Sequence, residues 1–488
     1  MASKKIKVLL VNPPQIYYGR SLGFNVYFPL GLLYLAANIR DICEVKVLDC
    51  LVEGFQIQEK DEVFRYGMTF DELKKTAEDY SPDVIGFTIP FSAQAEIGIE
   101  VSDHLREACP NSKIVIGGPH ASIRYQDLLE KSSADYCIVG EGEVTFRAFV
   151  ESILDGKDPG LEDGVVELRD GVANYTPRKA LDDLDLLPLP AYDLINYQDY
   201  FDSPHLYKSR SAIRKKSISM ITSRGCPFNC SFCSIMHHMG KKYRYNSTEH
   251  VMKHIQFLVD EMGVENIHFE DDNLSLNKVR FEEILDALII KKHDINWDTP
   301  NGIRADTLNQ EKIRKIKESG CSSLQIAIES GNQEILNSVI RKDTDLTYVL
   351  QVIDWCHEVG LKLGAFYVIG FPGETEIEMQ DTIKLALRLY QEKQVFPILL
   401  FATPLYGTEL YKICVEKGYI QDGVKDSDFA SATQFYGDPL ITTEDFGPEL
   451  LKKMAADFEK EIDKPLHDGA LRDMLVHREK VFAEVDSR

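Results

Sequence analysis

The first 150 residues alternate between short apolar runs and longer segments in which apolar positions recur at helical spacing. Short apolar runs between helices are typical of strands in a parallel sheet, because helices cover both faces of such a strand. The pattern predicts strands at residues 5–11, 45–49, 83–88, 113–118 and 136–140, and helices at 29–40, 70–80 and 95–109. We therefore expect an open α/β sheet with helices on both faces at the front of the chain.

The same alternation resumes near residue 216 and continues to about residue 415. Each predicted strand there ends in polar or glycine-rich residues, as strands do at the functional rim of a βα barrel. The expected strands are 217–222, 266–269, 297–304, 323–328, 363–369 and 396–401, and the expected helices are 248–262, 280–292, 310–320, 346–360 and 376–394. Six such units predict a second α/β domain whose site lies at the carboxyl ends of its strands.

The alternation of strand and helix patterns stops between these two regions and after the second. Residues 151–215 are acidic and punctuated by proline, which predicts a linker, with one hairpin at 165–174 around an Asp-Gly turn. Five basic residues within 208–216 are most simply a solvated patch. We expect domains at 1–150 and 216–415, the linker 151–215, and a helical C-terminal extension at 416–488.

The composition excludes several classes of function. The 488 residues carry a net charge of −23, which disfavours unassisted binding to nucleic acid or to anionic membranes. We expect no transmembrane segment, because no apolar stretch reaches the ~18–20 residues that span a bilayer. The N-terminal residues lead directly into a strand rather than a secretory signal, so a cytoplasmic location is expected.

The ten cysteines fall into two groups. Most are scattered in apolar runs and are expected to be small buried side chains. Cys226, Cys230 and Cys233 instead form a C-x₃-C-x₂-C array among turn-forming residues. Three thiolates suit a [4Fe–4S] cluster with one iron left open to a small molecule. A zinc site, which usually has four ligands in pairs, and a fortuitous cluster are the alternatives.

This array, with Phe232 before its last cysteine, resembles the signature loop of radical S-adenosylmethionine enzymes, and the second domain resembles their partial (β/α)₆ barrel. The resemblance implies that S-adenosylmethionine chelates the open iron. It also implies cofactor contacts at the strand ends, by Phe232, Arg244, Asp271, Asp272, Arg304, Glu329, Ser330, Gly370 and Pro372. Helix capping by the two aspartates and a structural role for Arg304 are the simpler alternatives.

Glycines follow two predicted strands of the front domain, where a ligand could approach the backbone closely. No G-x-G-x-x-G follows the first strand, which disfavours a nicotinamide dinucleotide. The motifs at 11–14, 117–120 and 135–143 resemble the Rossmann-like cobalamin-binding domain of B12-dependent radical enzymes. The resemblance implies cobalamin contacts by Asn12, Pro13, Gly117, Gly118, His120, Gly140, Glu141, Gly142 and Glu143.

The D-x-H-x-x-G motif of other B12 proteins is absent, so no histidine ligand to cobalt from below is expected. His120 is expected to be a loop residue near the edge of the corrin ring. Simple tight turns are the alternative explanation for the glycines.

Together the two resemblances imply a B12-dependent radical methyltransferase. In that family a 5′-deoxyadenosyl radical takes hydrogen from an unactivated carbon, which then receives the methyl group of methylcobalamin. A cyclase or rearrangement enzyme with the same cofactors is the alternative. A B12-free front domain or a non-catalytic binding module are others, although the intact cysteines argue against the latter. We expect an electron donor such as ferredoxin or flavodoxin, while the substrate (peptide side chain, lipid, tetrapyrrole or small metabolite) and any catalytic side chain stay open.

Overall fold

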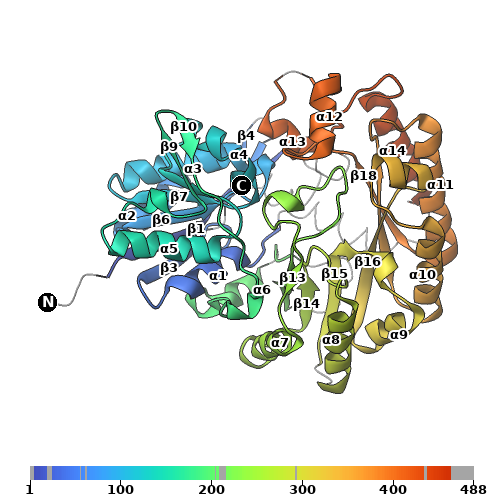
Figure 1. The fold of residues 1–488 in the computed structure, drawn as a ribbon, viewed down its shortest axis with the longest axis horizontal. Coiled ribbons are helices and arrows are strands. Elements are labelled where there is room, and N and C mark those ends of the chain that lie inside the picture. Colours follow the sequence, from blue (N-terminus) through green and yellow to red (C-terminus); the bar gives the residue numbers. More distant parts are fainter. Residues whose placement is uncertain are drawn as a thin grey trace.

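The computed structural model describes residues 5–18, 25–54, 56–60, 63–203, 205–207, 216–291, 294–421, 423–432 and 437–462. Two α/β units lie side by side, the front unit in blue to teal and the second in green to orange (Figure 1). The C-terminal helices α12 (Glu409–Lys417) and α13 (Asp426–Ala432) lie across the top, between the two units. The basic segment 208–215 and the end of the chain after residue 462 lie outside the described residues.

The front sheet has the strand order β10-β9-β8-β7-β6-β1-β3. The five predicted strands are confirmed, and they run parallel to one another. The hairpin predicted at 165–174 is also present, and its first strand extends this sheet past residue 150. The strands are β1 (Lys7–Asn12), β3 (Glu44–Asp49), β6 (Val84–Thr88), β7 (Lys113–Gly117), β8 (Tyr136–Ile138), β9 (Val165–Arg169) and β10 (Val172–Asn174).

Helices cover both faces of this sheet, as the strand pattern predicts. One face packs on α1 (Leu30–Ile39) and α5 (Gly142–Leu154), and the other on α2 (Phe70–Tyr80), α3 (Ala95–Ala108) and α4 (Pro119–Lys131). Helices α4 and α5 were not predicted, because each begins within a glycine motif that looks like a loop in sequence. A small sheet of β2 (Gln15–Tyr18), β5 (Val63–Gly67) and β4 (Gln56–Lys60) was also missed.

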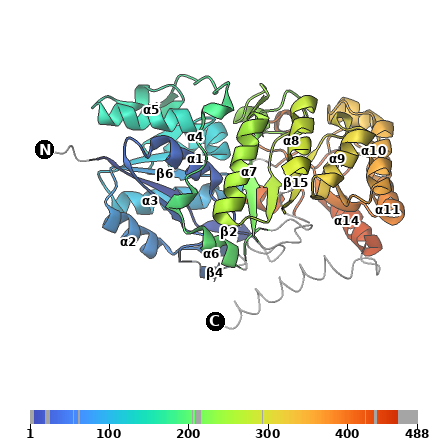
Figure 2. The same cartoon turned by 90° about the horizontal axis from the view of Figure 1, so that it is seen from below.

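The second unit is an open, six-stranded parallel sheet in the order β11-β14-β15-β16-β17-β18, which confirms the partial barrel. Figure 2 shows its helices following one another along the outside. The strands are β11 (Ser217–Met220), β14 (Asn266–Phe269), β15 (Asn296–Ile303), β16 (Cys321–Glu329), β17 (Leu363–Ile369) and β18 (Phe396–Phe401). The helices are α7 (Thr248–Met262), α8 (Lys278–Lys291), α9 (Gln310–Glu318), α10 (Leu346–Glu358) and α11 (Glu376–Lys393), and α14 (Pro448–Ile462) from the tail packs beside α11.

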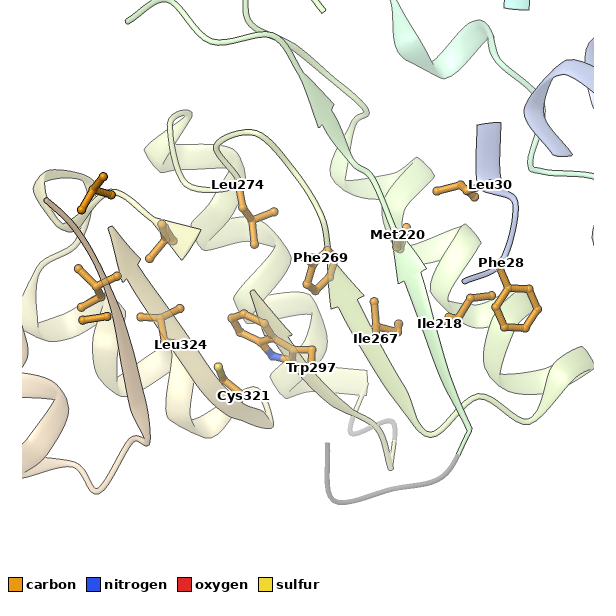
Figure 3. Packing of buried hydrophobic residues seen from close by; sticks show 14 of the residues in the cluster. Phe28, Leu30, Ile218, Met220, Ile267, Phe269, Leu274, Trp297, Cys321 and Leu324 are labelled. Carbon is orange, nitrogen blue, oxygen red and sulfur yellow. The ribbon is translucent and has the colours of Figure 1, made fainter. Parts of the chain in front are cut away.

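One of the two hydrophobic clusters runs through both units. Phe28 and Leu30, at the start of α1, lie close to Ile218 and Met220 on β11, the first strand of the barrel sheet (Figure 3). Helix α6 (Tyr197–Asp202), within the predicted linker, stacks the Tyr200 ring on Phe28 at a centroid distance of 4.4 Å. Burying this edge strand fixes the front sheet relative to the barrel.

Candidate active site

The cysteine loop begins and ends in a short antiparallel pair, β12 (Ser223–Arg224) with β13 (Arg244–Tyr245). Cys226, Cys230 and Cys233 are partly exposed on this loop, whereas the other seven cysteines are buried, and all ten are free thiols. The division expected from the sequence is therefore present in the structure. Partial exposure suits metal ligands, because a cluster must be reached by cofactor and reductant.

The three thiols lie on one partly exposed loop, which suits the three protein ligands of a four-iron cluster. The ligands of a four-iron cluster bind separate irons, so their sulfurs stand apart. Burial raises the pKa of Cys233 to about 12, so its thiolate form at neutral pH needs a bound cation nearby.

The two adjacent aspartates after β14 both hold the start of this loop. Asp271 accepts hydrogen bonds from Thr222 Oγ1 at 2.7 Å and from Ser223 Oγ at 2.5 Å, and it is 2% exposed. Asp272 accepts from the Gly225 amide at 2.8 Å and is only half-buried. Of the pair, Asp272 is therefore the one with accessible surface for a ligand. Burial raises its pKa to about 6.

Arg304 supports the same loop from the end of β15. Its guanidinium lies 3.7 Å from the centroid of the Phe228 ring, between two of the cysteines. The fork pairs with Asp306 at 2.7 Å and also donates to the Lys342 carbonyl. Arg304 thus pairs with a carboxylate of the protein itself.

The ends of β16 and β17 complete the rim. Glu329, with φ of +68°, forms a buried ion pair with Lys342 at 2.7 Å, and Ser330 lies 3.2 Å from Thr382 Oγ1. Lys342 carries no local sequence pattern, so it was missed.

The loop after β17 is held by Glu374, which accepts from the Gly370 and Phe371 amides at 2.8 and 2.7 Å. The Phe371 ring lies 5.7 Å from that of Phe232 and half-buried Pro372 follows, so this loop borders the cysteine loop. Glu374 was not among the predicted site residues, although the G-F-P-G-E run contains it.

In the front unit, β1 lies between β3 and β6, so the strand order reverses there and a ligand crevice is expected at the carboxyl ends. Asn12 and Pro13 are buried at this end of β1. The Asn12 amide donates to Asp49 at 2.8 Å, and Asp49 also accepts from Tyr200 at 2.6 Å. Asn12 therefore belongs to a network that fastens α6 to the sheet.

The glycine motif after β7 leaves room for a flat ligand. A Cβ on Gly117 would have no atom within 4 Å, whereas one on Gly118, at φ +102°, would lie 2.5 Å from Thr88 Oγ1. His120 is not a loop residue as expected. It is 3% exposed in the first turn of α4, with Nδ1 3.0 Å from Ser92 Oγ, and burial lowers its pKa to about 4. The open side of Gly117 fits a corrin ring.

The motif after β8 lies directly against the cysteine loop. Glu141 and Glu143 pair with Arg224 at 2.7 and 2.6 Å, and Glu141 also pairs with Arg244. We call these four side chains the junction; each is at most 10% exposed.

The two arginines of the junction face each other across β12 and β13, where like charges repel. The front unit thus supplies the anions that stabilise the base of the cysteine loop. Gly140, at φ +80°, and Gly142, at the start of α5, bring the backbone to this contact; a Cβ on Gly140 would lie 3.7 Å from the His238 carbonyl oxygen.

Comparisons with known proteins agree with this arrangement. The Radical SAM superfamily model matches residues 220–386, and the B12 binding domain model matches residues 23–150. An uncharacterized methyltransferase of Pyrococcus horikoshii is 32% identical over 84% of this chain and 84% of its own length. The cytidylyl-2-hydroxyethylphosphonate methyltransferase of Streptomyces wedmorensis is 29% identical over 85% of this chain and 82% of its own.

The fold is also that of solved structures. The methyltransferase TsrM from Kitasatospora setae, with cobalamin and a [4Fe–4S] cluster bound, superposes with a TM-score of 0.69 at 17% identity, over 95% of this chain and 92% of its own. None of the helices in the described part of the chain has the length and apolar character of a membrane span. The chain belongs to the cobalamin-dependent radical S-adenosylmethionine enzymes and is a methyltransferase of that family.

Proposed function

We propose that this methyltransferase acts on an unactivated carbon of a small polar metabolite. The junction carries the proposal, because it holds the carboxyl edge of the front sheet against the cysteine loop. A substrate between the two cofactor sites is then close to both. The acceptor of the Streptomyces wedmorensis relative is a small nucleotide-linked molecule, which supports this substrate class over a peptide, lipid or tetrapyrrole.

The cofactors supply the radical and the methyl group, and the protein positions them. Cys226, Cys230 and Cys233 would hold the cluster, and the rim residues Asp272, Glu329, Ser330 and the Gly370–Pro372 backbone would hold S-adenosylmethionine. The open side of Gly117 would face cobalamin. Per turnover, one C–H hydrogen is replaced by methyl, while two S-adenosylmethionine and two electrons give S-adenosylhomocysteine, methionine and 5′-deoxyadenosine.

A one-electron donor is needed for this balance. We propose a low-potential carrier such as ferredoxin or flavodoxin, which would reach the cluster by its partly exposed loop. An oxygen-sensitive cluster also favours a reducing compartment, so we place the enzyme in the cytoplasm.

The test is a product assay on anaerobically reconstituted protein loaded with methylcobalamin and a chemical reductant. We expect S-adenosylhomocysteine and 5′-deoxyadenosine together when candidate metabolites are supplied, with label from methyl-deuterated S-adenosylmethionine in the product. Formation of 5′-deoxyadenosine with no S-adenosylhomocysteine would favour the cyclase alternative. Absence of bound corrinoid after purification from B12-supplied cells would remove the methylase proposal.

A further inference from the structure

The concave face of the barrel sheet carries a group of buried polar side chains that the cofactor sites do not use. Side chains alternate along a strand, so His268 and Glu270 lie opposite to the core residues Ile267 and Phe269 that Figure 3 shows. Asp298 on β15 pairs in register with His268. Gln325 on β16 shares this face, because the preceding residue Leu324 points into the core, and a Cβ on the paired Gly364 would lie 2.0 Å from the Gln325 Oε1.

His268 and Asp298 form a buried dyad. The His268 Nδ1 atom lies 2.8 Å from Asp298 Oδ1, and the two side chains are 1% and 3% exposed. In the neutral ring with the Nδ1 proton directed at Asp298, Nε2 is an acceptor. The Asn266 amide nitrogen lies 3.5 Å from the other carboxylate oxygen of Asp298 and steadies it.

Several atoms of this group lack a partner. In the described ranges, His268 Nε2, Asn266 Oδ1 and Gln325 Oε1 are buried and make no hydrogen bond. His268 and Asn266 are 1% and 0% exposed, so bulk water does not compensate. Buried polar atoms are rarely left unpaired, and three on one face of one sheet indicate a missing ligand.

The chemistry of the face selects the ligand. The unpaired atoms are acceptors, and the nearby carboxyl of Glu270, which accepts from Ser219 Oγ at 3.3 Å, adds another. Two basic side chains at the rim, Arg304 and Lys342, are already paired with Asp306 and Glu329. An anion would therefore be repelled here, whereas a hydrogen-bond donor would be satisfied.

We propose that His268, Gln325 and Asn266 form a subsite for a hydrogen-bond-donating group, an amine or hydroxyl, of the methyl acceptor. The proposal rests on the proposed function, since it places part of that substrate. His268 lies two residues before Glu270, where β14 has ended, about 7 Å along the strand. A group bound there leaves the rest of the molecule directed to the rim and the cofactors.

Three probes of one shape test the chemistry: propylamine, 1-propanol and propionate. We expect a crystal of the full chain soaked in propylamine or 1-propanol to show the probe on His268 Nε2, and which of the two binds separates an amine from a hydroxyl. Propionate should be absent. Ordered water alone with every probe, or propionate alone, would overturn the subsite.

Ligand-observed NMR with the same probes extends the test to variants in solution. We expect Gln325→Leu and His268→Phe each to lower the saturation-transfer signal at least about tenfold, the effect of 1.4 kcal/mol. Gln391→Leu, on the exposed side of α11, should leave it unchanged. Equal signals in wild type and Gln325→Leu would contradict the subsite.

Two measurements distinguish a failure of the subsite from a failure of the proposed function. Substrate-free formation of 5′-deoxyadenosine by wild type tests the cofactor machinery, and we expect it to persist in Gln325→Leu. Loss of probe binding with this activity retained supports the subsite. Bound probe in a protein that makes neither 5′-deoxyadenosine nor S-adenosylhomocysteine would instead count against the proposed function.

Discussion

The junction and the barrel interior both bury polar side chains, but they do so in opposite ways. At the junction, two glutamates meet two arginines, and the charges balance. On the concave face of the barrel, His268, Asn266 and Gln325 each leave an atom unpaired within the described structure. Burying polar groups is costly unless they are paired, so the first arrangement stabilises the protein and the second implies a ligand that completes it.

Three of the acidic residues predicted to contact cofactors make their contacts within the protein instead. Glu141, Glu143 and Asp271 were predicted to contact cofactors, but their side chains serve the loop that carries the cysteines. Holding that loop is a precondition for cofactor chemistry, because a cluster needs its ligands at fixed positions. Their direct contact with cobalamin or S-adenosylmethionine stays a prediction.

The largest expected effect is on the loop that the junction supports. Changing Cys226, Cys230 or Cys233 to Ala should reduce 5′-deoxyadenosine formation to background, because a cluster with two protein ligands is not retained. The measurement is 5′-deoxyadenosine by chromatography alongside iron content. Cys109→Ala, a buried thiol of the front unit, is the matched control and should keep both. Wild-type levels in any one of the three variants would contradict the assignment.

The next effect tests pairing at the junction. Glu143→Gln leaves Arg224 with one anion in a site where its side chain is 8% exposed, and removing a partner from a buried pair costs about 3 kcal/mol. The measurement is the urea midpoint of unfolding. Asp193→Asn breaks the exposed pair with Arg40, at 43% and 64% exposure, and should cost less than about 1 kcal/mol. Equal losses of stability in the two variants would mean that the buried pair at the junction is no stronger than the exposed pair.

The pH dependence of this effect has a definite sign. Burial acts to raise the pKa of Glu143, but Arg224 holds it below the ordinary 4.5. The stabilisation is therefore present above pH 4.5 and is lost as pH falls through the lowered value. The difference in the free energy of unfolding between wild type and Glu143→Gln should therefore decrease as the pH is lowered.

Substitutions at two neighbouring glycines should distinguish an effect on stability from an effect on cobalamin binding. Gly118→Ala should cost about 2 kcal/mol, because φ is +102° and the new Cβ meets Thr88 and the Ile89 carbonyl. Gly117→Ala has no such contact and should change stability by less than about 0.5 kcal/mol. Its methyl group would instead stand in the crevice and lower the corrinoid retained, measured by absorbance after gel filtration. Full retention in Gly117→Ala would place cobalamin elsewhere.

The smallest effect concerns the barrel interior and runs in the opposite direction to that of Glu143. Burial raises the pKa of Glu270 from 4.5 to about 7. The stability contributed by the protonated Glu270 carboxyl is complete below pH 4.5 and is lost as pH rises through 7, because the buried carboxyl must then ionise. Wild type should lose about 1 to 2 kcal/mol relative to Glu270→Gln between pH 5 and 8.5. Urea unfolding of both proteins at the two pH values checks this. An equal change in the free energy of unfolding of wild type and Glu270→Gln would refute it.

Much of the fold and part of the site were predictable because their patterns are local. The strands of both sheets follow from short apolar runs, and the helix after Ser247 follows from its cap, whose Oγ accepts from the His250 amide at 3.1 Å. Helices α4 and α5 were missed because glycine motifs precede them. The partner of Arg224 could not be predicted, because Glu143 is 81 positions away in the chain.

What the sequence alone determined is therefore the class of the protein: the spacing of three cysteines, the two runs of alternating strands and helices, and the glycines at strand ends. These depend on neighbours within a few residues, where covalent geometry restricts the choices. Only the tertiary structure decided that Asp271 is buried while Asp272 stays accessible, that Glu141 and Glu143 face two arginines, and that His268 is paired on one side alone. Such outcomes depend on which surfaces pack together, and burial then decides which polar atoms must find a partner.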